Sequence, residues 1–209
     1  MKIKYIVFDL GGVLMDIDFN KTFEAYSKIT GNPKETLRDS KLLLDVYLNY
    51  ESGTITDEDF RNAIRKKLNV DVDDKTIDSA WNALLLDFNS QAISLLRSLK
   101  GKYPLYLLSN TNNIHFNHSN QKIATQNLAE SLVSLFDGLF LSYRMGCRKP
   151  SEEIYQQVIK QLKCLPQEIL FIDDLELNTK AAEELGIQTI LLTDKNKITE
   201  LVLNKLNYS

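Results

Sequence analysis

Four short polar clusters in the sequence carry side chains of types that do chemistry together. They supply three carboxylates, a hydroxyl, an amide and a lysine. The stretches are "FDLGG", "LLSN", "KP" and "FIDD", and the side chains are Asp9, Ser109, Asn110, Lys149, Asp173 and Asp174. Each cluster alone has an ordinary explanation as a turn, a helix N-cap, a surface lysine or a polar loop. They form one site only if the fold brings them together.

The elements that must position these side chains are five short apolar segments that alternate with helical patterns. Each segment has the length and composition of a buried β-strand. The segments are residues 4–10, 103–110, 138–143, 168–174 and 187–193. This alternation predicts an α/β fold with a Rossmann-like parallel sheet. Because parallel strands place their carboxyl ends at one edge of the sheet, we expect the four clusters to converge there.

Between the strands, two helices are predicted with their ends. The segment 151–162 begins at Ser151, a residue type that caps helix N-termini, and its apolar residues recur on one face. The segment 178–186 ends at Gly186, as helices often do. By contrast, the polar stretch 110–127 is long for a connection between a strand and a helix. We interpret it as a loop that is functional, contacts another subunit or is mobile.

Residues 18–88 interrupt the alternation with four helix-like segments and no convincing strand. One of these segments opens with a capping box formed by Thr56 and Asp59. An insert placed directly after the first strand lies above the carboxyl edge of the sheet, where open α/β folds bind ligands. We therefore expect an all-helical cap domain of residues 18–88 over an α/β core domain of residues 1–17 and 89–209.

The composition is that of an ordinary globular protein and excludes several classes of function. Of the 209 residues, 44% are hydrophobic, and the formal net charge of −3 gives no field that attracts nucleic acid or an anionic membrane. No segment approaches the roughly 18 consecutive apolar residues of a membrane span. Cys147 and Cys164 fit neither a disulfide framework nor a zinc site. We expect a cytoplasmic protein that binds neither nucleic acid nor membrane, and the sequence leaves its oligomeric state open.

Three carboxylates at one sheet edge would repel one another and raise one another's pKa unless a cation joined them. Oxygen ligands of this kind are those that Mg²⁺ prefers, together with substrate oxygens and water. Lys149 and Ser109 then remain to hold a phosphoryl group, with backbone N–H groups of the turn from Asp9 to Gly12 as further donors. The clusters thus predict a magnesium site for a small phosphorylated metabolite.

The order of "FDLGGVL", "LLSN", "KP" and "FIDD", with a helical insert after the first, resembles the haloacid dehalogenase superfamily of aspartate-nucleophile hydrolases. The resemblance covers essentially the whole chain. The stretches "DLGGVLMDIDFN", "LSNTNNIH", "MGCRKPSEEIY" and "FIDDLELN" are further similar to the bacterial α-D-glucose-1-phosphate phosphatase subgroup. The phosphatase domain of soluble epoxide hydrolases is also similar, although it has an Asp at the position of Gly11.

The resemblance implies a role for each of these residues in a magnesium-dependent phosphatase. Asp9 would attack phosphorus and become an aspartyl phosphate, and Lys149 would neutralise charge on Asp9 and on the phosphoryl group. The other implied roles are Mg²⁺ binding by Asp9, the Gly11 carbonyl, Asp174 and Asp173, phosphoryl binding by Gly11, Gly12, Ser109, Asn110 and Lys149, and orientation of Asp174 by Asn178.

Gly11 departs from the usual pattern of these phosphatases, which have there an Asp that protonates the leaving group and activates water. Such acid–base assistance is worth about 10²- to 10⁴-fold in rate, whereas phosphoryl transfer relies mostly on positioning and electrostatics. The loss would matter least for a good leaving group, such as the anomeric oxygen of glucose 1-phosphate. We therefore expect sugar phosphates of that kind as substrates.

His115, six residues after Ser109, is a candidate for the missing acid or for a contact to the sugar. A histidine occupies this place in the glucose-1-phosphate phosphatase subgroup too. The alternative is a solvent-exposed loop histidine without a role in the reaction.

Two other functions compete with the phosphatase. A hydrolytic dehalogenase of the same fold also lacks an Asp at the Gly11 position, but it needs no metal and does not explain Asp173 and Asp174. A catalytically weak binding or regulatory protein explains Gly11, but not the retained nucleophile, lysine and metal carboxylates.

Overall fold

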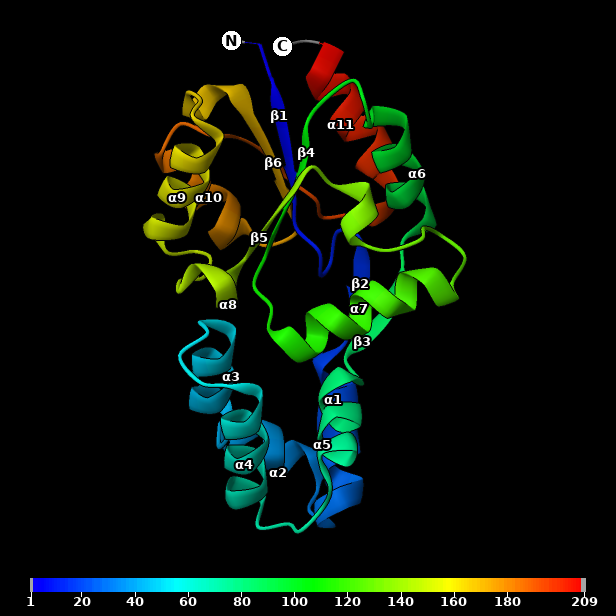
Figure 1. Ribbon diagram of the computed structural model, residues 1–209, viewed down its shortest axis with the longest axis vertical. Coiled ribbons are helices and arrows are strands. Elements are labelled where there is room, and N and C mark those ends of the chain that lie inside the picture. The colour runs from blue at the N-terminus through cyan, green and yellow to red at the C-terminus, as the bar shows by residue number, and fades with distance from the viewer. Residues whose placement is uncertain (1, 208–209) are drawn as a thin grey trace.

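The computed structural model describes residues 2–207, which form two parts (Figure 1). A β-sheet with helices on both faces makes up the larger part, and the two ends of the described chain lie near each other at its far edge. A cluster of helices makes up the smaller part. Two extended segments of the chain join them.

The larger part is built on five parallel strands in the order β5-β4-β1-β6-β7. All five predicted strands are present, each within the predicted segment. Their bounds are β1 Tyr5–Phe8, β4 Leu105–Ser109, β5 Gly138–Leu141, β6 Ile169–Asp173 and β7 Gln188–Leu191. The predicted α/β fold with a parallel sheet is confirmed, and β1 lies at its centre.

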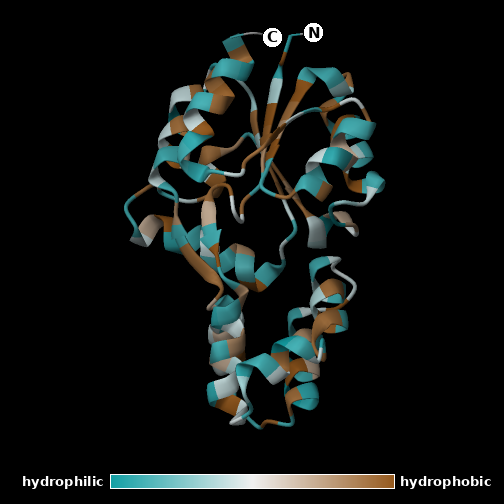
Figure 2. Cartoon of the chain, turned by 180° about the vertical axis from the view of Figure 1, so that it is seen from behind, coloured by the Kyte–Doolittle hydropathy of each residue, from teal (hydrophilic) through white to brown (hydrophobic). Residues whose placement is uncertain are grey.

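Both faces of the sheet are buried, and this is why its strands read as continuous apolar runs. Ile6 and Phe8 pack in one hydrophobic cluster, and Val7 between them packs in the other. Figure 2 shows the strands as a brown, hydrophobic layer between helices of mixed colour. The first face is covered by α6 Ser90–Leu99, α7 Asn113–Thr125 and α11 Ile198–Asn207, and the second by α9 Glu152–Leu162 and α10 Glu176–Glu184.

Short helices complete this part of the molecule. They are α8 Ser142–Met145 and the single 3₁₀ turns Val133–Leu135, Pro166–Glu168 and Lys195–Lys197. Among residues 2–207, no helix has both the length and the apolar character needed to cross a lipid bilayer.

The two helices predicted with their ends are confirmed with small changes. α9 starts directly after Ser151, but the side chain of Ser151 makes no capping hydrogen bond. α10 ends at Glu184, and Gly186 follows with φ +86°. A residue with a side chain rarely adopts this left-handed conformation, so glycine is favoured here.

The polar stretch 110–127 is a helix, so its interpretation as a loop is wrong. α7 occupies most of it, and the Asn112 side chain caps its N-terminus by accepting a hydrogen bond from the His115 backbone N–H. The buried face of α7 includes His115 and Ser119. Because these two polar residues interrupt the apolar stripe, the helical periodicity was too weak to recognise.

The smaller part of the molecule lies beyond the carboxyl ends of the sheet strands (Figure 1). The predicted helical insert after the first strand is confirmed, with five helices in place of four. They are α1 Phe19–Thr30, α2 Lys34–Asp39, α3 Leu44–Glu51, α4 Asp57–Leu68 and α5 Asp74–Asn82. The predicted capping box of Thr56 and Asp59 starts α4. Trp81 is buried and packs on Phe60, so it has a core role.

The two segments that join the parts pair as a short antiparallel ribbon, β2 Met15–Ile17 with β3 Leu85–Phe88. The expectation that residues 18–88 contain no strand is therefore wrong. A strand of four residues shows too little alternation to stand out beside a helix. The division into a cap of residues 18–88 and a core of residues 1–17 and 89–209 stays a proposal, with β3 counted in the cap.

Candidate active site

Asp9 follows β1 at the carboxyl edge of the sheet, where a buried lysine joins it to a second carboxylate. The Lys149 Nζ lies 2.8 Å from the Asp9 Oδ1 and 2.6 Å from the Asp173 Oδ2. The side chains of Lys149 and Asp173 are 1% and 0% exposed. Removing one member of such a buried set leaves an uncompensated charge. The fold thus holds Asp9, Lys149 and Asp173 as one unit, which we call the triad.

The triad shifts the pKa values of its members. Burial raises the pKa of Asp9 to about 7, with Asp173 adding to the rise and Lys149 opposing it. Burial alone would lower the pKa of Lys149, but the charges of Asp9 and Asp173 outweigh it, and the pKa lies above its ordinary value. Lys149 is therefore a fixed positive charge beside Asp9.

Asp174 completes a cluster of three carboxylates. Asp9, Asp173 and Asp174 each offer an oxygen, and these oxygens all lie within 4.8 Å of one another. Burial raises the pKa of Asp174, and the charge of Asp173 raises it further. A divalent cation would favour the ionised form of all three. This oxygen-only donor set with excess negative charge fits Mg²⁺.

The two aspartates that follow Ile172 differ in what they bind. The carboxylate of Asp173 accepts hydrogen bonds from the Leu175 backbone N–H at 2.8 Å and from the Asn178 Nδ2 at 2.9 and 3.0 Å, in addition to Lys149. The prediction that Asn178 orients Asp174 is therefore wrong, because Asn178 holds Asp173. Asp174 is half-buried and is the freer of the two to bind a metal ion.

The two glycines after Leu10 have different reasons to be glycine. Gly12 has φ +80°, and a Cβ there would lie 2.2 Å from the Asp174 Oδ2, so a side chain would strain the backbone and displace the Asp174 carboxylate. Its N–H donates to the Met15 carbonyl at 2.8 Å, so its predicted donation to a phosphoryl group is wrong for this structure. A Cβ on Gly11 would lie 3.2 Å from the Ile17 Cδ1. A small shift of Ile17 would admit a side chain at Gly11.

Ser109 ends β4, which pairs with β1, and Asn110 follows it, but the two side chains have different surroundings. Ser109 is 3% exposed and lines a small cavity at the sheet edge. The Asn110 Oδ1 accepts from the Lys149 backbone N–H at 2.8 Å, and the Asn110 Nδ2 donates to the Lys149 carbonyl at 2.9 Å. The Asn110 side chain thus positions Lys149 through its Oδ1 and one of its two Nδ2–H donors. Its binding to a phosphoryl group stays a prediction.

The cavity that Ser109 lines is the space between the sheet edge and the cap. It has a volume of about 60 Å³, and Gly11, Ser109 and Asn110 line it from the core. Glu51 and Phe19 line it from the cap. The two parts of the molecule therefore close over one side of the site.

His115 also lines this cavity, but its ring is occupied. It is 6% exposed, so the alternative of a solvent-exposed histidine is wrong. The ring stacks on Trp81, the Nε2 lies 3.0 Å from the Trp81 carbonyl, and the Nδ1 lies 3.1 Å from the Asn112 Nδ2. A neutral ring with the proton on Nε2 satisfies both contacts. Burial lowers the pKa of His115 to about 3, so this geometry does not support a catalytic acid here.

Two residues of the site were missed from the sequence. The Arg148 Nη2 donates to the Glu51 Oε2 at 2.8 Å, which joins the loop before Lys149 to the end of helix α3 in the cap. Arg148 directly precedes Lys149 in the sequence, and this position could have indicated that it belongs to the site. Nothing in the sequence indicated that Glu51 faces it.

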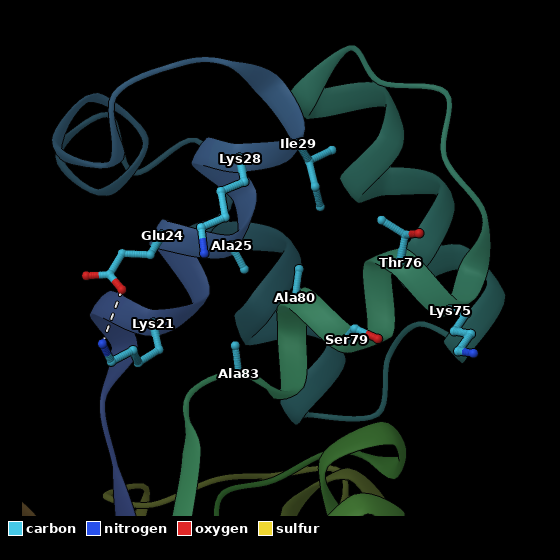
Figure 3. Close-up of a pocket in the computed structure, with 10 residues that line it drawn as sticks. All are labelled: Lys21, Glu24, Ala25, Lys28, Ile29, Lys75, Thr76, Ser79, Ala80 and Ala83. Carbon is cyan, nitrogen blue, oxygen red and sulfur yellow. Dashed lines mark hydrogen bonds and ion pairs between the residues drawn. The ribbon is translucent and has the colours of Figure 1, made fainter.

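A larger groove lies in the cap between α1 and α5, away from this site (Figure 3). It has a volume of about 630 Å³. Ala25, Ile29 and Ala80 line it together with lysines, and Lys21 pairs with Glu24 at its rim. It contains neither the triad nor a carboxylate cluster, so size alone does not identify the active site.

Comparison with known proteins agrees with this geometry. Residues 3–186 match the family of haloacid dehalogenase-like hydrolases. The chain is 30% identical, over 90% of each chain, to D-ribitol-5-phosphate phosphatase of Bacteroides thetaiotaomicron.

Two solved structures are also similar. One is a HAD family enzyme, bt-2542 of Bacteroides thetaiotaomicron, in complex with magnesium and inorganic phosphate. It is 39% identical, with 90% of this chain and 93% of that chain covered and a TM-score of 0.78. The other is a predicted HAD-like family hydrolase from Porphyromonas gingivalis, 28% identical over the whole of both chains with a TM-score of 0.87. The chain belongs to the haloacid dehalogenase-like hydrolase family.

Proposed function

We propose that this protein hydrolyses small phosphate monoesters, including sugar and polyol phosphates, through an aspartyl phosphate on Asp9. It is a magnesium-dependent phosphatase of the haloacid dehalogenase-like family. The observation that carries the proposal is the triad with Asp174 beside it, because it combines a nucleophilic carboxylate, a fixed cation and a free metal ligand at one sheet edge.

The residues of the chain perform the two halves of this reaction as follows. An Asp9 oxygen attacks phosphorus as the bond from phosphorus to the ester oxygen breaks, and water later attacks phosphorus and returns the carboxylate. Lys149 holds positive charge beside the Asp9 oxygens throughout. The Ser109 hydroxyl, which lines the cavity at the sheet edge, donates to a phosphoryl oxygen in this proposal. Fixed charges and donors of this kind supply most of the catalysis in phosphoryl transfer.

Mg²⁺ would be held by Asp9 and Asp174, with the Gly11 carbonyl as a further ligand. Asp173 would be a weaker, secondary ligand. When bound, the ion offsets the negative charge of the phosphoryl group and of the carboxylates. Asp173 contributes mainly by holding Lys149, since its carboxylate accepts from the Lys149 Nζ and is itself held by the Leu175 N–H and the Asn178 amide.

Within this class, we propose glucose 1-phosphate and related sugar 1-phosphates as good substrates. Gly11 supplies no acid, and the anomeric oxygen needs less protonation than an ordinary alkoxide. The similarity to a D-ribitol-5-phosphate phosphatase supports primary phosphates of polyols as a second group. A small phosphorylated metabolite in the cytoplasm remains the proposed partner.

The competing functions have less support. A metal-free dehalogenase leaves the cluster of Asp9, Asp173 and Asp174 without a purpose. A binding protein without activity leaves the buried triad unexplained, since a buried ion pair is not in itself a stabilising device.

A phosphate-release screen tests the proposal. It compares sugar 1-phosphates, sugar 6-phosphates, polyol phosphates, nucleotides and phosphoamino acids, with and without Mg²⁺. We expect release that requires Mg²⁺ and is greatest with sugar and polyol phosphates. Absence of release from every ester in the presence of Mg²⁺ would contradict the proposal.

A further inference from the structure

Among residues 2–207, the core side of the site offers no free acid that can pass a proton to the leaving oxygen. Gly11 has no side chain, both His115 nitrogens have partners and Lys149 is held between two carboxylates. In an in-line reaction the leaving oxygen departs on the side opposite Asp9. That side faces the cap.

Glu51 is the carboxyl group that the cap places there. It is the last residue of α3, and it lines the same cavity of about 60 Å³ as Gly11 and Ser109. Only its Oε2 has a described hydrogen bond, to the Arg148 Nη2 at 2.8 Å, among residues 2–207. The Oε1 is left for a ligand.

Several contacts fix this turn of the cap on the core. Gly53 lies so close to the core that a Cβ there would come within 2.0 Å of the Tyr143 carbonyl. The Asn113 Nδ2 donates to the Asp57 Oδ2 at 2.8 Å, and the Ile114 N–H donates to the Tyr50 hydroxyl at 3.3 Å. Glu51 therefore holds its position over the cavity because its neighbours on both sides are docked.

The surroundings of Glu51 suit an acid. A carboxylate at a helix C-terminus faces the negative end of the helix dipole, which disfavours its ionised form. Burial raises the pKa of Glu51, and the charges of Arg148 and then Lys149 oppose the rise. The pair with Arg148 keeps the group in place without removing its ability to be protonated.

We propose that Glu51 is the catalytic acid and base that replaces the side chain absent at Gly11. This rests on the proposed function. When Asp9 attacks phosphorus, the leaving oxygen takes the electron pair of the broken bond and the proton of Glu51, and it departs as a neutral alcohol. Water then attacks the aspartyl phosphate, its proton passes to Glu51, and the electron pair of the broken bond returns to Asp9.

The test compares Glu51→Gln with the native enzyme on two esters in the presence of Mg²⁺. p-Nitrophenyl phosphate has a leaving group that needs no proton, and glycerol 3-phosphate has a poor one. We expect kcat/KM for glycerol 3-phosphate to fall about 10²- to 10⁴-fold, with little change for p-nitrophenyl phosphate. Glu58→Gln, an exposed glutamate of α4, is the matched control and should change neither.

A gain of function separates proton transfer from a structural role. Gly11→Asp in the Glu51→Gln background offers a carboxyl from the core, and only the Ile17 side chain must shift to admit it. We expect partial recovery on glycerol 3-phosphate.

An equal loss on both esters, or an unchanged glycerol 3-phosphate rate, would overturn the role of Glu51 while leaving the phosphatase intact. No release by the native enzyme from either ester would overturn both.

Discussion

The molecule holds two sets of paired charges at its candidate active site, and they differ in how they are held. In the core, Asp9 directly follows β1, Asp173 ends β6 and Lys149 lies in the loop before α9. Partners surround all three side chains. Across the cavity, Glu51 comes from the cap and has one partner, Arg148. The core set is as rigid as the sheet, whereas the position of Glu51 depends on how the cap is docked.

The difference separates two tasks. Charge development at phosphorus is the same for every phosphate ester, so a fixed arrangement serves it well. The leaving group differs between substrates and must enter and depart. We propose that it meets the cap side of the site, where the position of Glu51 depends on the contacts that dock the cap on the core. We therefore expect core substitutions to affect all substrates equally and cap substitutions to affect them selectively.

The largest effect is expected for Asp9→Asn. Without the proposed nucleophile, kcat/KM should fall by about 10⁴-fold or more for every phosphate ester, as for loss of other enzyme nucleophiles. Phosphate release with several esters measures it, and Asp71→Asn, at an exposed position, is the control. A loss confined to some esters would contradict the expectation that core substitutions affect all substrates equally.

Lys149→Met should abolish phosphatase activity and lower the free energy of unfolding. It leaves Asp9 and Asp173 buried without their shared cation, and breaking a buried ion pair costs about 3–5 kcal/mol in the free energy of unfolding. Urea denaturation measures the loss. Lys160→Met on the exposed side of α9 should change little. Equal unfolding free energies for the two variants would show that the triad is not the compact unit described.

Asp174→Asn should abolish the response of the folded protein to Mg²⁺. A ligand present at 100 times its Kd stabilises the native state by about 2.7 kcal/mol. We expect Mg²⁺ to raise the Tm of the native protein and not that of the variant, in differential scanning fluorimetry without substrate. An unchanged response would mean that Asp173, not Asp174, is the main ligand from this pair.

The smallest effect is expected for Thr56→Ala, in the cap. Loss of the capping box of α4 costs about 1 kcal/mol of stability. Because Thr56 lies outside the cavity, kcat/KM should stay the same for good and poor leaving groups. A selective loss on poor leaving groups would show that the position of Glu51 depends on α4 more than its own contacts suggest.

The sheet and the residues at its edge were predictable because of how parallel strands are buried. Strands covered on both faces read as apolar runs that stop where the polar residue begins, and topology brings those ends together. Asp9, Lys149 and Asp173 meet as expected, and Ser109 ends β4, the strand that pairs with β1. The hydrogen-bond partners within the site could not be predicted. Residue types alone do not show that Asn178 binds Asp173 or that Asn110 binds Lys149.

The features that were missed share one property, which is that long-range packing decides them. The buried face of α7 includes the polar residues His115 and Ser119, which obscure its helical periodicity in the sequence. β3 is a strand only because β2 pairs with it. Glu51 and Arg148 are 97 residues apart in the sequence. No local pattern records a contact that arises when a cap docks on a core.

The central claim, that Asp9 is the nucleophile, is tested most directly by trapping its phosphoryl group. The native enzyme is mixed with substrate and Mg²⁺, quenched in acid during turnover and analysed by peptide mass spectrometry, with Asp9→Asn as control. We expect a phosphoryl group on Asp9 of the native enzyme and none in the variant. Rapid release of phosphate with no phosphoryl group on Asp9, under conditions where an acyl phosphate survives, would contradict the account.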